Sequence, residues 1–229
     1  MRTMESGAVA APPPVMLSDL PLFPLGIVLL PDERLPLHIF EPRYRDLVAR
    51  CEQGDEPFAI VLQDETGVRD TACTARITHV LERMPDGRSN ILVQGEQPVR
   101  LLELLDVRSY RTAVADPLRD TRREADLDAQ QAALAAYGAL GESADDLDLP
   151  EAPLVGPHLS YRLAGRVGFG PEVKQRLLEE RDEGARIDEV TRLLAEVRRG
   201  LALAAEAQTR ARRNGRVRLP EELAAELGL

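Results

Sequence analysis

The chain has 229 residues, a formal net charge of −10 at pH 7 and 44% hydrophobic residues, which is enough apolar content to bury the core of one large or two small domains. Aromatic residues make up only 3% and tryptophan is absent, so the core must be built from Leu, Val, Ile and Ala. The acidic balance repels phosphate backbones and argues against general nucleic-acid binding.

Residues 1–17 are expected to form a disordered extension, because small residues and the prolines from Pro12 to Pro14 dominate them. This segment lacks the apolar core of a signal peptide, and no later segment reaches the roughly 18 consecutive apolar residues of a membrane span. We therefore expect a cytoplasmic protein. A translation start at Met16 is an alternative explanation for the first 15 residues.

The first patterned segment begins at Leu20, where leucines and Phe23 interleave with Pro21 and Pro24. Because proline lacks the amide donor that a central strand needs, this pattern predicts an extended strand at the edge of a sheet. A short apolar run, 27–30, and a turn follow.

The next residues alternate at the period of a half-buried strand, with Leu35, Leu37 and Ile39 on one face and Pro36, His38 and Phe40 on the other. Pro42 then begins a helix, since proline is tolerated in the first helical turn. Its apolar face is predicted to contain Tyr44, Leu47, Val48 and Cys51, which recur at helical spacing.

Further strands are predicted in the following part of the chain. Phe58–Leu62 is a short apolar strand, and the polar segment Asp64–Cys73 is expected to be a loop. From Ala75 to Met84 we expect alternation, with Ala75, Ile77, His79 and Leu81 on one face and Arg76, Thr78, Val80 and Glu82 on the other. The Pro85–Gly87 turn should return the chain as a hairpin through Ile91–Val93, before strands at Val99–Leu105 and Tyr110–Ala115. So many strands with one early helix favour a small mixed barrel over a doubly wound sheet.

The composition changes at Asp120, where Ala, Arg, Glu and Gln become frequent and predict an amphipathic helix with Leu127, Leu134 and Tyr137 on one stripe. An acidic loop, Glu142–Asp148, is followed by a second short helix from Leu159 and by a third that Gly170 and Pro171 open. The last long helix spaces Ile187, Val190, Leu194, Val197 and Leu201 like a heptad. A packed helical bundle is the favoured interpretation, and a coiled-coil dimer is the alternative.

Three segments carry a family resemblance, in this order: LPLFPLGIVLLPDERLPLHIFEPRYRDLV (20–48), PFAIVLQ (57–63) and TARITHVLERMPDGRSNILVQGEQPVRLLEL (74–104). They resemble the N-terminal substrate-binding domain of Lon proteases, especially its small stand-alone versions. The helical LSYRLAG (159–165) and VKQRLLEE (173–180) continue the likeness, which covers most of residues 18–204. The resemblance implies an α+β fold, a PUA-like mixed β pseudo-barrel followed by a helical bundle, and a role in substrate recognition.

The catalytic parts of full-length Lon enzymes have no counterpart in this sequence. There is no GxxxxGK[ST] loop to hold phosphates. Lys174 is the only lysine, so it cannot serve both a phosphate loop and a serine-lysine peptidase dyad, and its context predicts the surface of a helix. We therefore expect a protein that is not an enzyme.

Other motifs give no support for a cofactor or a metal. The glycines of Gly165–Gly170 follow a helix, so they predict a turn between helices and not a nucleotide loop. His38, His79 and His158 have no ligand spacing, and the acidic loop lacks the glycine and final glutamate of a calcium loop. The two cysteines, Cys51 and Cys73, suit reduced, partly buried thiols.

These patterns predict four regions: the extension 1–17, a barrel unit 18–118, a helical unit 119–205, and a basic tail 206–229 that ends in a short amphipathic helix with Leu219, Leu223 and Leu227. The segment RVRLPEELAAELGL in the tail resembles part of AbrB-like DNA-binding domains over fewer than 20 residues. The favoured interpretation is structural, a basic helix end followed by the short amphipathic helix, for which docking on a protein is one use; DNA binding is the alternative.

The favoured function is a non-catalytic polypeptide-binding module, which would act as an adaptor or regulator in protein quality control. The expected partners are unfolded or exposed hydrophobic polypeptide segments, a protease, or a second copy bound through the Ile187 to Leu201 helix; nucleic acid and membranes are not expected.

Candidate contact residues are Phe40, Pro42 and Tyr44, where the strand turns into the first helix. For each, core packing is the favoured alternative, because Tyr44 and Val48 share an i, i+4 face. The alternative function is a PUA-like protein that binds a small molecule or RNA.

The purified protein is expected neither to hydrolyse ATP nor to cleave unfolded protein, because the residue types for both reactions are missing. Phosphate release and casein fragmentation measure the two activities, with Lys174→Ala as the control protein. Phosphate release above that of the control would contradict this expectation. So would cleavage of casein by an activity that co-purifies with the protein.

Overall fold

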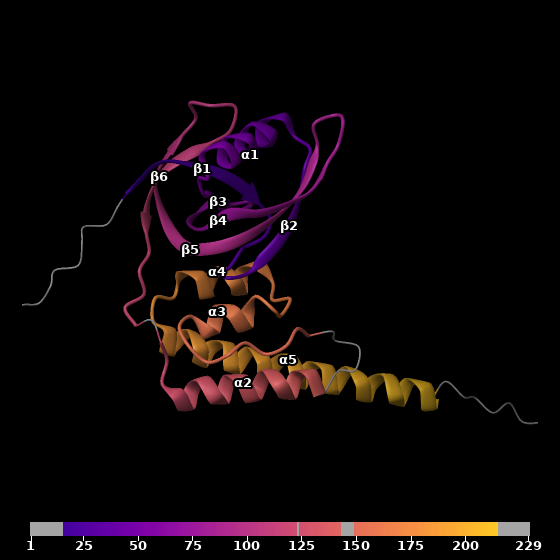
Figure 1. The fold of residues 1–229 in the computed structure, drawn as a ribbon. Coiled ribbons are helices and arrows are strands. Elements are labelled where there is room, and N and C mark those ends of the chain that lie inside the picture. The colour runs from indigo at the N-terminus through magenta and orange to yellow at the C-terminus, as the bar shows by residue number, and fades with distance from the viewer. Residues whose placement is uncertain (1–15, 123, 143–148, 215–229) are drawn as a thin grey trace, which may run out of the picture.

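The computed structural model describes residues 16–122, 124–142 and 149–214. Strands come first and helices second, apart from one early helix (Figure 1), so the predicted α+β class is confirmed. The strands are β1 (Leu17–Leu25), β2 (Arg34–Ile39), β3 (Phe58–Asp64), β4 (Gly67–Arg83), β5 (Ser89–Leu105) and β6 (Thr112–Pro117). The helices are α1 (Pro42–Gly54), α2 (Leu127–Glu142), α3 (Leu159–Ala164), α4 (Pro171–Glu179) and α5 (Glu183–Asn214). None of these helices has both the length and the apolar character needed to cross a bilayer.

Within the described residues, the strands form one sheet in the order β2-β5-β4-β3-β1-β6, and β5 also pairs with β6. That extra pairing closes the sheet into a barrel, with β2 outside the ring. Strand β5 makes this possible because Ser89–Gln94 pairs with β2 while Val99–Leu105 pairs with β6. The two strands predicted at 91–93 and 99–105 are therefore one long strand that changes partners along its length.

Strand β1 is not the edge strand that its prolines predict. It lies between β3 and β6, parallel to the first and antiparallel to the second. The prediction fails because a proline removes only its own N–H, and neighbouring residues still donate: the Leu22 amide bonds to the Arg111 carbonyl at 2.9 Å. Among the described strands, β2 is the one that ends the sheet, since β5 is its sole partner.

The prediction of a loop at Asp64–Cys73 is also wrong, because only a tight turn separates β3 from β4. The Asp64 carboxylate accepts hydrogen bonds from the Thr66 amide at 2.7 Å and from its hydroxyl. Gly67 follows with φ of 119°, a conformation that favours glycine. The polar residues of this segment therefore belong to the start of a strand.

The predicted alternation in β4 fails beyond Ile77. Register shifts occur between Ile77 and His79 and again between Val80 and Glu82, and each shift is a bulge that reverses the faces. In the structure, 78–83 are all exposed, so neither predicted face of this segment is buried. The hairpin through the Pro85–Gly87 turn is confirmed, with Gly87 at φ of 85°.

The barrel is packed on both faces of its central strand. In β3, Phe58, Ile60 and Leu62 belong to a large core, while Ala59 and Val61 belong to a second, smaller one. Helix α1 covers the large core and buries the four predicted residues, Tyr44, Leu47, Val48 and Cys51. Both cysteines are free and buried, and burial raises the pKa of the Cys51 thiol to about 11.

Helices α2 to α5 stack on one side of the barrel, with α4 next to the strands (Figure 1). The buried face of α2 consists of Gln130, Ala133, Tyr137 and Leu140. Leu127, which was predicted to lie on the buried stripe, is 63% exposed, so that part of the prediction is wrong. Ile187, Val190 and Leu194 of α5 are fully buried in the core. The heptad face is thus filled within the chain, which favours the bundle over a dimer through Ile187–Leu201.

Helix α5 continues to Asn214, past residue 205 where the helical unit was expected to end. At the other end, β1 already begins at Leu17, within the expected extension. The glycine-rich segment Gly165–Gly170 is the turn between α3 and α4, as predicted. The acidic loop beyond Glu142 and the short helix predicted at Leu219–Leu227 lie outside the described residues.

Replacing Gly95 by alanine is expected to destabilise the fold by about 3 kcal/mol, since overpacking a well-filled site typically costs 1–3 kcal/mol. An alanine Cβ at this position of β5 would lie 2.2 Å from the Leu30 carbonyl oxygen, which is backbone and cannot easily move. Urea unfolding measures the change.

Gly138→Ala is the matched control, because a Cβ at this exposed site in α2 meets nothing within 4 Å. It should stabilise the protein by about 0.5–1 kcal/mol through helix propensity. Equal stability of the two variants would contradict the close approach at Gly95.

Candidate functional site

The structure separates the three residues predicted to contact a partner. Phe40 follows the last residue of β2 and is 57% exposed, with its ring stacked on that of His38 at a centroid distance of 5.8 Å. Pro42, the first residue of α1, is also exposed. These two side chains are therefore accessible to a partner at the junction of β2 and α1.

Tyr44 is only 7% exposed and packs in the core. Its ring stacks on Phe23 with centroids 4.1 Å apart, and the Arg43 guanidinium lies 4.5 Å from its centroid on the outer side. Burial raises the pKa of the phenol. Core packing, the alternative that the i, i+4 spacing favours, is what the structure shows for this residue.

An exposed apolar surface extends from Phe40 onto the β4–β5 hairpin. Leu81 is 57% exposed and its neighbour Val80 is also exposed. A groove of about 670 Å³ lies on this surface, and we call it the β2 groove; its lining consists of Pro36, Leu37, His38, Leu81, Glu82 and Asn90. Sequence reasoning missed Leu81, because strict alternation assigned it to the same face as the buried Ala75.

A row of polar side chains crosses the β2 groove from strand to strand. His38 pairs in register with Asn90 of β5, which in turn pairs with Glu82 of β4. The His38 Nδ1 lies 2.7 Å from Asn90 Oδ1, and Asn90 Nδ2 donates to Glu82 Oε2 at 2.9 Å. The groove thus combines apolar walls with an ordered polar row that ends in a carboxylate.

A second groove, of about 370 Å³, lies between α1 and the β4–β5 hairpin and includes Pro42 in its lining. Here the hairpin is fastened to α1 by two contacts. Arg45 donates to the Asp86 carbonyl at 2.8 Å, and Arg83 pairs with Glu52 at 2.7 Å. Phe40 lies in sequence between His38 of the first groove and Pro42 of the second.

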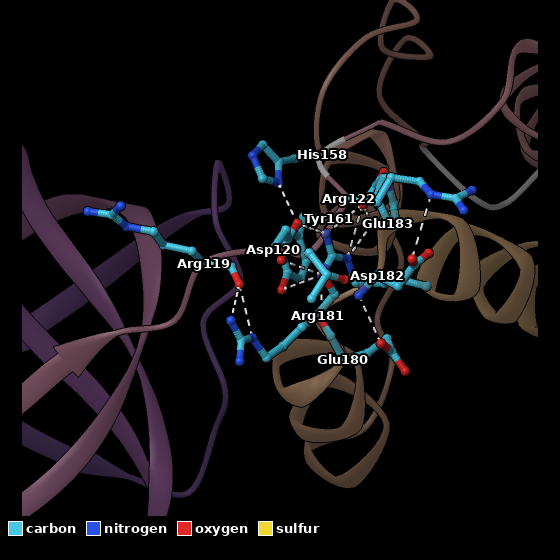
Figure 2. Close-up of polar contacts among 12 residues, drawn as sticks. Arg119, Asp120, Arg122, His158, Tyr161, Glu180, Arg181, Asp182 and Glu183 are labelled. Carbon is cyan, nitrogen blue, oxygen red and sulfur yellow. Dashed lines mark hydrogen bonds and ion pairs between the residues drawn. The ribbon is translucent and has the colours of Figure 1, made fainter. Parts of the chain in front are cut away.

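The largest cluster of buried charge lies elsewhere, where the chain passes from the barrel to the helices (Figure 2). The fully buried guanidinium of Arg186 in α5 contacts Asp120 at 2.6 Å and Glu183 at 2.6 Å. It also donates to Ser160 Oγ at 2.7 Å and to the Tyr161 hydroxyl at 3.0 Å. His158 Nδ1 lies 3.3 Å from Asp120 Oδ2.

The oxygen and nitrogen atoms of Asp120, His158 and Glu183 lie within 4.8 Å of one another, a spacing that a metal ion could bridge. The arrangement does not fit a metal, because the Arg186 guanidinium already supplies the positive charge between the two carboxylates. Burial raises the pKa of Asp120, but hydrogen bonds from His158 and Arg186 outweigh it and hold that pKa below 3.8. The cluster is therefore structural.

The single lysine is a structural residue too, and its predicted place on a helix surface is wrong. Lys174 of α4 and Glu33 of the segment before β2 form an ion pair at 2.5 Å, and both side chains are largely buried. Glu33 also accepts a hydrogen bond from the Leu30 amide at 3.0 Å. This pair joins the helical layer to the barrel, which a surface lysine would not do.

Known proteins resemble this chain over most of its length. The family model of the ATP-dependent protease La (LON) substrate-binding domain matches residues 19–196. The Lon protease of Parabacteroides distasonis is 31% identical over 112 residues, which cover 45% of this chain and 14% of that protein. The Lon protease of Paraburkholderia phytofirmans is 28% identical over 195 residues, or 76% of this chain and 24% of that protein. The matches thus span less than a quarter of either relative.

Solved structures show the same fold. The Lon N-terminal domain protein from Xanthomonas campestris has a TM-score of 0.59 and 24% identity, over 78% of this chain and 98% of that one. The N-terminal domain of the Mycobacterium avium complex Lon protease has a TM-score of 0.56 and 16% identity, with the same coverage.

Replacing Asp120 by asparagine is expected to destabilise the protein by about 3 kcal/mol at pH 7, because it leaves buried charge without its partner. The Asp120 pKa is lowered in the folded state, so its charge contributes fully above pH 3.8 and the contribution is lost as pH falls below that value. The difference from the unaltered protein should therefore shrink in acid. Urea unfolding over a pH series measures it.

The control for this prediction is Asp188→Asn, an exposed carboxylate on the same helix as Arg186, which should change stability by no more than about 0.5 kcal/mol. A constant gap between Asp120→Asn and the unaltered protein down to pH 2 would show that the charge of Asp120 contributes nothing.

Proposed function

The chain belongs to the Lon substrate-binding domain family, and from this membership and its exposed surface we propose that it is a non-catalytic polypeptide-binding module. The observation that carries the proposal is the β2 groove, beside which Phe40 and Leu81 each stay 57% exposed. We propose that it acts in protein quality control as an adaptor or regulator. Its partners would then be polypeptide segments that expose apolar side chains.

The physical case rests on the placement of these side chains. Leu81 of the β4–β5 hairpin lines the groove, and Phe40 at the end of β2 stacks on His38, which lines it too. Exposed aromatic residues beside a groove are typical anchors for a protein partner, since burying them supplies binding energy. Strand β2 ends the described sheet, so a bound segment would lie beside an edge whose Pro36 lacks an amide donor.

The hairpin end of the β2 groove lies away from helices α2 to α5. Helix α1 and the β4–β5 hairpin are on the side of the barrel opposite α2 to α5 (Figure 1). A partner that docks there would leave the Arg186 cluster and the Lys174 ion pair undisturbed. The module would therefore bind as a preformed surface, without rearrangement of its layers.

Phe40→Ala and Leu81→Ala are each expected to weaken binding of a labelled unfolded casein by about five- to tenfold, the loss typical of an anchor residue. Folding stability should change by no more than about 0.5 kcal/mol, because both side chains are exposed. Fluorescence anisotropy measures affinity and urea unfolding measures stability. Leu102→Ala is the matched control, since Leu102 is 54% exposed in the half of β5 that pairs with β6.

The alternative function, RNA binding, is tested by the same anisotropy assay with a labelled RNA at low and high salt. Apolar binding should depend weakly on salt, whereas RNA binding should fall steeply because each phosphate contact releases counterions. Steeply salt-sensitive RNA binding, with no affinity for casein, would overturn the proposal. Equal losses in all three variants would show that binding occurs elsewhere on the protein.

A further inference from the structure

The carboxylate of Glu82 lines the β2 groove and differs from Glu52 and Asp55, two acidic residues that line the neighbouring grooves. In the groove beside α1, Glu52 pairs with Arg83. In a third groove, which Arg76 of β4 and the end of α1 line, Asp55 pairs with that arginine at 3.0 Å. Glu82 is exposed in the β2 groove, and in the described part of the chain its one polar contact is the Asn90 amide. It is therefore a negative charge without a cationic partner.

The contact with Asn90 fixes the direction of this carboxylate. Because Asn90 Nδ2 donates to Glu82 Oε2, the Asn90 Oδ1 faces His38 and accepts from Nδ1. The His38 ring is in turn stacked on Phe40. The row thus connects the aromatic ring to the carboxylate, and within the described residues Glu82 Oε1 has no hydrogen bond.

A β-bulge places Leu81 and Glu82 in the same groove. In a regular strand, consecutive side chains point to opposite faces. Here Val80 pairs with Ile91 and Glu82 pairs with Asn90, so Leu81 is the extra residue between two successive pairs. Bulges re-aim side chains in this way, and both residues line the β2 groove as a result.

We propose that the β2 groove selects polypeptide segments in which a basic residue stands next to an apolar one. The apolar residue would pack on Phe40 and Leu81, and the Lys or Arg side chain would pair with the free oxygen of Glu82. This inference rests on the proposed polypeptide-binding function and narrows it to a class of segment. Glu82 is the acidic residue among those that line this groove, so the attraction for a basic side chain comes from this one carboxylate.

The expected size of the preference is small, because the ion pair forms at an exposed site. Exposed pairs contribute about 0.2–1 kcal/mol, which corresponds to a preference of up to about fivefold in affinity. The preference should decrease as salt is added, since exposed charges are screened. The apolar part of the binding should remain in high salt.

The test compares two labelled peptides that share one apolar sequence and differ only in a flanking Lys or Gln. Fluorescence anisotropy measures both against the full chain and against Glu82→Gln, whose amide oxygen can still accept the bond from Asn90. The unaltered protein should bind the Lys peptide about two- to fivefold more tightly, and Glu82→Gln should bind both peptides equally. Glu103→Gln is the control, since it removes the same charge from an exposed site in the β6-paired half of β5.

The outcomes separate this inference from the proposed function. If both peptides bind the unaltered protein equally, or if Glu103→Gln also removes the preference, Glu82 does not select basic segments, while polypeptide binding stands. If neither peptide nor casein binds, both the inference and the proposed function are wrong. Loss of the preference in Glu82→Gln alone, with apolar affinity retained, supports the inference.

Discussion

The buried guanidinium of Arg186 is the interaction on which the arrangement of the two layers depends. It joins Asp120, which follows the last strand, to Ser160 and Tyr161 of α3 and to Glu183 of its own helix. Removing a charge of this kind from water costs several kcal/mol, which only a complete set of partners offsets. Because the partners come from the linker after β6, from α3 and from α5 itself, the cluster has its full set of contacts only when barrel and helices are correctly docked.

Two further contacts reinforce this junction. The Arg181 carbonyl accepts a hydrogen bond from the Thr121 amide at 2.8 Å, so the linker after β6 pairs with the segment between α4 and α5. The Lys174–Glu33 ion pair fastens α4 to the segment before β2. Polar contacts thus fix the orientation of layers whose apolar cores alone would permit sliding, since hydrophobic packing is not directional. The β2 groove is supported by this frame without being part of it.

Local periodicity predicted the parts of the fold that local sequence controls. The apolar face of α1 was predicted residue by residue, because helical spacing and Pro42 act within the helix itself. The edge position of β1 was wrong, since the place of a strand in a sheet depends on partners that are far away in sequence. Asp120 marked a change in composition, but nothing near Arg186 distinguished it from the many solvated arginines on helices. His158 gained its neighbours only through the docking of α3 against the linker.

The candidate site shows the same division. Phe40 was named as a candidate contact although core packing was favoured for it, and the structure shows it exposed. Leu81 was not named, because a bulge cannot be detected from a two-residue period. The bulge between Val80 and Glu82 turns Leu81 and Glu82 toward the same groove.

The exposure of the anchor residues also bounds how strongly the surface can bind. Complete burial of a Phe or Leu side chain contributes about 1.5–3 kcal/mol, and roughly half of that remains available to a partner at residues as exposed as Phe40 and Leu81. Two such contacts and one exposed ion pair supply about 2–4 kcal/mol, which the entropic cost of association offsets. A single segment would therefore bind weakly and dissociate quickly. Under the proposed function, such a surface would favour unfolded chains, because a folded protein hides its apolar residues and an unfolded chain presents them repeatedly.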